Sequence, residues 1–96
     1  MTRCRRDANH SEVSDWYRQA GCSVLDLSQV GMGCPDLLIG CAGVCDLVEV
    51  KVEGADLRAD QRTFNDKWRG SRPWKVTTLD DVLRHVSDLR RRARRL

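Results

Sequence analysis

Three polar residues interrupt two apolar, strand-like segments in the middle of this 96-residue chain. Asp36 precedes the apolar run Leu37–Ile39, and Glu49 and Lys51 lie two residues apart in the alternating run 47–52. Carboxylates bind hard divalent cations such as Mg²⁺ or Mn²⁺, and a lysine amine can hold a phosphate or polarise a water molecule. Together these three side chains could hydrolyse a phosphodiester bond.

A tight turn at Ala42-Gly43 would bring the two acids together. With the strands paired residue by residue from this turn, Asp36 lies opposite Glu49 on one side of the sheet, and Lys51 shares that side. Carboxylates in such a position repel each other, and a bound cation would remove the repulsion. The alternative is that Asp36 is a turn residue and that Glu49 and Lys51 form a solvated pair on an exposed strand.

The rest of the chain supplies the elements that position this hairpin. Helical spacing, alternation and turn residues predict the order helix, three strands, helix, strand, helix. This order predicts a single-domain α/β fold over residues 1–96, in which helices flank a mixed β-sheet. His85, beside the apolar stripe of the last helix, is expected at the boundary of the core. The predicted elements are a helix after Asn9 that ends at Gly21, strands at 22–27, 37–39, 47–52 and 74–77, a helix that Asp60 caps, and a helix that Thr78 caps.

Two polar residues on predicted helices are further candidates. Gln61 lies on one stripe with Phe64 and Trp68, which we expect to be core residues, and a buried amide needs hydrogen-bond partners. We therefore expect Gln61 to have an accessory role in the site rather than to be a plain surface residue. Glu12 lies three residues after Asn9, where it can complete a capping box.

Several short motifs surround the candidate residues in a fixed order. They are Gly33, Pro35-Asp36-Leu37-Leu38, Glu49-Val50-Lys51, Gln61 and Trp68-Arg69-Gly70. Together they resemble the VRR-NUC branch of the PD-(D/E)XK nuclease superfamily, small phage-type enzymes related to Holliday-junction resolvases. The resemblance implies a restriction-endonuclease-like α-β-β-β-α-β core with a C-terminal helix added. It also implies a homodimer that cuts branched or flap DNA in the cytoplasm of a bacterium or a phage-infected cell.

The resemblance assigns a role to each candidate residue. It implies that Asp36, Glu49 and the carbonyl oxygen of Val50 hold Mg²⁺ or Mn²⁺, with Lys51 placed to activate the attacking water. An acidic residue on the first helix completes the metal site of related nucleases, so this role for Glu12 stays open beside capping. The catalytic set is therefore Asp36, Glu49, Lys51, Gln61 and Glu12.

Positive charge is concentrated at the two ends of the chain, which has a net charge of +3. Residues 90–96 form a basic C-terminal tail, and three arginines lie close to the N-terminus. This distribution suits a polyanion such as DNA, whereas the alternative for the tail is a frayed, solvated end. The expected nucleic-acid-binding residues are Arg3, Arg5, Arg6, Arg62 and Arg69.

The apolar runs and the cysteines of the sequence bear on its cellular compartment and on one alternative kind of site. No apolar run is long enough to span a membrane, and no signal-peptide pattern is present, so we expect no membrane partner. Five cysteines, an odd number, indicate reduced thiols in a cytoplasm. Small buried apolar roles are expected for them, with a structural zinc site as the alternative.

A second class of function fits the same basic ends. The chain could be a non-catalytic nucleic-acid-binding module, or a partner subunit that keeps the nuclease fold without cutting. Its intact acidic pair argues against this alternative, because a pure binder gains nothing from carboxylates that face a phosphate.

Overall fold

The computed structural model describes residues 9–96, in which three helices and four strands alternate along the chain. Their order is α-β-β-β-α-β-α, which confirms the predicted α/β fold with a mixed sheet. Within this range no helix is long and apolar enough to cross a lipid bilayer. The elements are α1 (His10–Gln19), β1 (Ser23–Asp26), β2 (Leu37–Cys41), β3 (Val44–Val50), α2 (Ala59–Lys67), β4 (Trp74–Val76) and α3 (Leu79–Ala93).

The sheet has the strand order β1-β2-β3-β4, and its central hairpin has the predicted register. β1, β2 and β3 pair antiparallel, whereas β3 and β4 pair parallel. Cys41 pairs with Val44, so Ala42 and Gly43 form the turn. Their φ angles of 55° and 86° lie in the left-handed region that two-residue hairpins with the native strand twist favour.

Ala42 is the weak position of this turn, because a left-handed backbone brings its Cβ close to a carbonyl oxygen. That conformation costs about 1–2 kcal/mol for most residues and less for asparagine. Ala42→Asn is therefore expected to raise the free energy of unfolding by about 1 kcal/mol, measured by urea denaturation. Ala42→Val should lower it, and equal stability of the three proteins would contradict this account of the turn.

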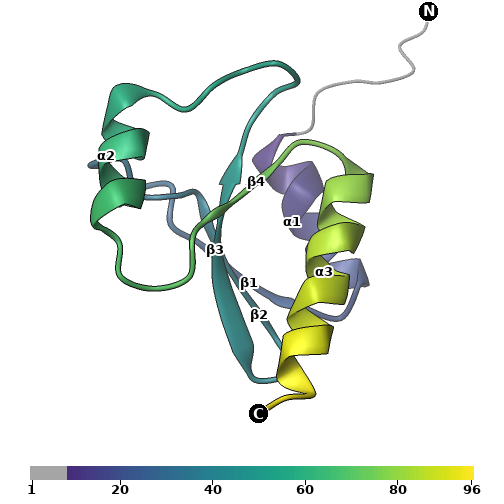
Figure 1. Cartoon of the computed structure of the whole chain (residues 1–96). Coiled ribbons are helices and arrows are strands. Elements are labelled where there is room, and N and C mark those ends of the chain that lie inside the picture. The colour runs from purple at the N-terminus through teal and green to yellow at the C-terminus, as the bar shows by residue number, and fades with distance from the viewer. Residues whose placement is uncertain (1–8) are drawn as a thin grey trace, which may run out of the picture.

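The helices form one layer on each side of the sheet. α1 and α3 pack together on one face, and α2 lies alone on the other (Figure 1). Alternate residues of β2 and β3 point toward α1 and α3, where the apolar core is buried. The largest apolar members of this core are Val13, Tyr17, Leu37, Ile39, Val48, Val76, Val82, Val86 and Leu89.

The α2 face of the sheet is covered less completely. Trp68 is 45% exposed and Phe64 is partly buried, so the expectation that both are core residues was wrong. The reason is that α2 has only nine residues and covers part of one sheet face. The helix also begins earlier than predicted, with Arg58 rather than Asp60 as its N-cap residue.

A polar network lies inside the core between α1, β3 and α3. The Tyr17 hydroxyl is 2.7 Å from Nδ1 of His85, and Nε2 of His85 is 2.7 Å from Oδ2 of Asp46. Arg92 forms an ion pair with the same aspartate, and Trp74 stacks on the His85 ring at 4.3 Å. His85 is fully buried, so its expected position at the core boundary was wrong. A buried histidine can lie here because both of its ring nitrogens have partners.

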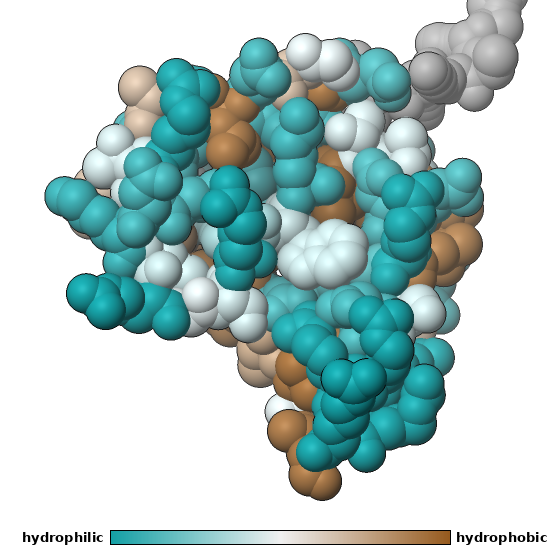
Figure 2. Space-filling view, viewed as in Figure 1, coloured by the Kyte–Doolittle hydropathy of each residue, from teal (hydrophilic) through white to brown (hydrophobic). Residues whose placement is uncertain are grey.

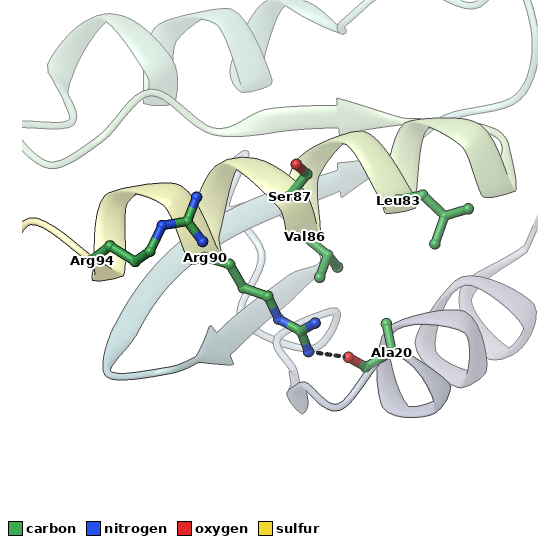
Figure 3. Close-up of a pocket in the computed structure, with 6 residues that line it drawn as sticks. All are labelled: Ala20, Leu83, Val86, Ser87, Arg90 and Arg94. Atoms are coloured by element: carbon green, nitrogen blue, oxygen red, sulfur yellow. Dashed lines mark hydrogen bonds between the residues drawn. The ribbon is translucent and has the colours of Figure 1, made fainter.

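The basic segment at residues 90–96 is mostly helix rather than a tail. Residues 90–93 belong to α3, and hydrophilic side chains gather over this end of the helix (Figure 2). Arg90 reaches across to α1 and donates a hydrogen bond of 2.6 Å to the carbonyl of Ala20, the C-cap residue of that helix (Figure 3). Arg90 and Arg92 therefore hold elements together. The groove beside Arg90 has a volume of about 460 Å³ and is lined by Ala20, Leu83, Val86, Ser87, Arg90 and Arg94.

Removing Asp46 is expected to be among the most destabilising single changes on this face. Its side chain has no exposed surface, and its loss leaves His85 and Arg92 without their shared partner. Asp46→Ala should lower the free energy of unfolding by about 3–5 kcal/mol, measured by urea denaturation. Asp15→Ala, at an exposed position of α1, is the control and should change it by less than about 0.5 kcal/mol. A similar small loss for both variants would contradict the structural role of the network.

Candidate active site

The hairpin places Asp36 and Glu49 side by side, as the sequence predicts. The β2–β3 ladder runs to the pair Leu37–Val48, so the next position sets Asp36 against Glu49. Oδ2 of Asp36 accepts a hydrogen bond of 2.9 Å from the backbone N–H of Val50. Burial, and then the hydrogen bond and negative charge of Asp36, raise the pKa of Glu49 to about 8. A shift in this direction is what two carboxylates produce when they share a buried position without a cation.

Gln61, on α2, holds the side chain of Glu49 in place. Its side chain is buried, and Nε2 donates a hydrogen bond of 2.8 Å to Oε2 of Glu49. Its Oε1 accepts a bond of 2.8 Å from the backbone N–H of Arg58, at the start of the helix. Gln61 therefore contacts the acidic pair, whereas its predicted accessory role in the chemistry stays a prediction. The same amide also caps α2, a structural role that the sequence analysis did not include.

Two cations lie near the acidic pair. Lys51 follows β3, where its backbone N–H donates to the carbonyl of Val76 at 3.0 Å. The positive charges of Lys51 and Arg58 each lower the pKa of Glu49, although burial and Asp36 outweigh them. The charge of Lys51 therefore acts on Glu49, whereas its predicted role in the chemistry stays a prediction. Arg58 was missed because it lies in a polar loop without any pattern that ties it to the hairpin.

The structure adds His10 and Cys34 to the site. Nε2 of His10, the first residue of α1, is 3.2 Å from Oδ1 of Asp36. Burial and the charges of Glu49 and Asp36 raise the pKa of the Cys34 thiol. His10 is not among the residues predicted for the site, because only the packing of α1 beside the strand entrance brings it to Asp36.

The first turn of α2 is held close to the loop before β2. Gly33 has a φ of 76°, and a Cβ at this position would lie 2.1 Å from the carbonyl oxygen of Asp60. Only glycine allows this approach. The contact holds the start of α2 near β2, so that Gln61 can reach Glu49.

The remaining predicted site residues lie around this centre or outside the described chain. The backbone N–H of Glu12 donates a bond of 2.9 Å to the Asn9 side chain, which confirms Asn9 as the cap of α1. A role of Glu12 in metal binding stays a prediction, as does the Val50 carbonyl ligand. Arg62 donates to the carbonyl of Leu57, and Arg69 is exposed after α2. Arg3, Arg5 and Arg6 lie outside the described residues.

The donor set suits a cation that needs few protein ligands. Among residues 9–96 no group of three or more His, Cys, Asp or Glu side chains is arranged to hold a metal ion. Mg²⁺ commonly binds through one or two carboxylates and completes its shell with water and phosphate oxygens. Asp36 and Glu49 fit that requirement, and a bound cation would offset the burial and the repulsion that together raise the pKa of Glu49.

Comparison of the chain with protein-family models, curated proteins and solved structures finds no match.

The raised pKa of Glu49 makes the stability of the metal-free protein depend on pH. The folded protein keeps a proton on Glu49 between pH 4.5 and about 8, whereas the unfolded chain has lost it, so stability falls as pH rises through this window. Glu49→Gln is expected to flatten this dependence between pH 5 and pH 8, measured as melting temperature in EDTA. Asp46, whose burial is outweighed by its bonds to His85 and Arg92, has a lowered pKa and titrates below the window.

Asp15→Asn is the matched control, because it removes an exposed carboxylate and should keep the wild-type slope. An identical slope in wild type and Glu49→Gln would contradict the burial of Glu49 against Asp36.

Proposed function

We propose that this protein is a metal-dependent DNA endonuclease that hydrolyses phosphodiester bonds. The observation that carries the proposal is the buried Glu49 carboxylate held against Asp36 by the hairpin register and by Gln61. Such a pair is unfavourable in the metal-free fold and favourable once a cation binds. The positive charge of Lys51 acts on the same pair and could stabilise charge that develops on a phosphate.

Each side chain has a distinct task in this mechanism. Asp36 and Glu49 would hold the ion, which when bound supplies a more acidic water and neutralises charge on the phosphate. Lys51 would orient the attacking water and stabilise the negative charge that develops on the phosphate oxygens. Gln61 positions Glu49 through its 2.8 Å hydrogen bond. His10 can orient Asp36 from 3.2 Å.

The resemblance to VRR-NUC nucleases supports the same proposal and suggests its substrate. It favours branched or flap DNA, a homodimer and products with a 5′-phosphate and a 3′-hydroxyl. Exposed basic residues such as Arg69 would add sequence-independent affinity for phosphates, and this affinity should fall steeply with salt. Mg²⁺ or Mn²⁺ is the expected cofactor, and the bacterial or phage-infected cytoplasm is the expected compartment.

Cleavage of labelled four-way-junction, flap and linear duplex DNA in Mg²⁺, Mn²⁺ or EDTA tests the proposal. We expect metal-dependent cutting that falls at least about 100-fold in Asp36→Asn, Glu49→Gln and Lys51→Met. The first two changes keep oxygen acceptors for Val50 and Gln61, so the fold should persist. Melting temperatures of all variants check this point.

Asp15→Asn is the control and should cut like wild type. Tight DNA binding without cutting in any metal would contradict the nuclease and favour the non-catalytic binding module. Cutting that survives Asp36→Asn and Lys51→Met would place the chemistry elsewhere.

A further inference from the structure

An exposed aromatic surface lies on α2, on the same helix as Gln61. The rings of Phe64 and Trp68 stack with centroids 5.3 Å apart and an angle of 17°. Met32, which is 86% exposed, borders the same shallow pocket of about 370 Å³, together with Thr63 and Lys67. We call Met32, Phe64 and Trp68 the aromatic platform.

The platform is held from one side and open on the other. Trp68 borders a second hollow that Leu38, Leu47 and Gly70 also line, so one part of the indole faces the sheet across this hollow. A Cβ at Gly70 would be only 2.6 Å from Nε1 of Trp68, which means that the loop backbone lies directly against the ring. An aromatic ring supported in this way can bind a flat ligand with little loss of side-chain entropy.

The charges around the platform favour a polyanion over a second copy of this chain. Residues 58–72 contain five basic side chains, Arg58, Arg62, Lys67, Arg69 and Arg72, against two acidic ones, Asp60 and Asp66. A two-fold dimer through this surface would place these basic side chains against the same side chains of the second copy. Three apolar side chains are also few for a stable protein interface, which needs about 20–30 residues on each side.

The platform lies within reach of the candidate active site. Gln61, Phe64 and Trp68 recur along one stripe of α2, and the helix rise places Trp68 about 10 Å from Gln61. Met32 lies in the loop before β2, and the residue that follows it, Gly33, contacts the start of α2. A strand bound at Asp36 and Glu49 could therefore place a neighbouring base on the rings.

We propose that the aromatic platform stacks an unpaired nucleobase and so selects DNA with a single-stranded segment beside the cleavage site. The stacking itself is independent of catalysis, whereas its role in substrate choice rests on the proposed function. Base–aromatic stacking tolerates any sequence, because every base has a flat face, and it requires that the base is not stacked inside a duplex. Flap and splayed DNA meet this condition, and intact duplex does not.

Binding of fluorescein-labelled oligo-dT and of a matched duplex, both in EDTA, tests the platform without cleavage. Trp68→Ala should weaken oligo-dT binding by about 5-fold to 150-fold and leave duplex affinity nearly unchanged. Trp68→Phe should keep most of the affinity, because it retains an aromatic face. Met32→Ser, at a position too exposed to support the fold, should weaken oligo-dT binding in the same direction. Leu83→Ala, at an apolar site on α3 that is about as exposed as Trp68, is the control and should have no effect.

Unchanged oligo-dT affinity in Trp68→Ala and Met32→Ser, or an equal loss for oligo-dT and duplex, would overturn the proposal. The proposal would also fail if these variants lost a dimer that the wild type forms in sedimentation while DNA binding stayed intact, because the surface would then bind a second copy of the chain. The two proposals fail separately. Selective oligo-dT binding without cutting in any metal would contradict the nuclease and keep the platform, whereas cutting that is indifferent to Trp68→Ala on flap DNA would contradict the platform's part in substrate choice.

Discussion

The register of the β2–β3 hairpin is the constraint on which the rest of the structure depends. It decides that Glu49 faces α2 and that Asp46 faces α3, because neighbouring positions of a strand point to opposite sides. A slip of one residue would exchange these faces and bury each acid against the wrong helix. The Ala42-Gly43 turn, with both residues in the left-handed region, sets this register.

Asp46 and Glu49 are both buried acids on β3, but their surroundings shift their pKa values in opposite directions. Asp46 is surrounded by His85 and Arg92, whose hydrogen bonds outweigh burial and lower its pKa. Glu49 has an amide and a second carboxylate as its immediate partners, and its pKa is raised. The first acid is compensated inside the protein and serves the fold. The second is not compensated in this way by its neighbours, and under the proposed function a bound cation would supply the missing positive charge.

The sequence predicts those features that depend on local pattern and misses those that depend on packing. Alternation and the glycine turn predict the hairpin, and through it the pairing of Asp36 with Glu49. Gln61 could be predicted because a polar residue on an apolar stripe needs partners. The contact of His10 with Asp36 could not, because nothing near either residue indicates how α1 approaches the strand entrance. Phe64 and Trp68 were assigned to the core because their spacing is helical, and spacing alone does not reveal how much of the sheet a nine-residue helix covers.

The double hydrogen bond of Gln61 has a thermodynamic consequence. One end of the amide binds Glu49 and the other binds the backbone at the start of α2, so the charge on the acid and the order of that helical turn are linked. Linkage is reciprocal: whatever favours one arrangement of Glu49 changes the population of the ordered turn, and the ordered turn in return changes affinity at Glu49 by the same factor. A single side chain thereby couples the charge state of Glu49 to the order of the helix beside it, so that a measurement of either one reports on the other.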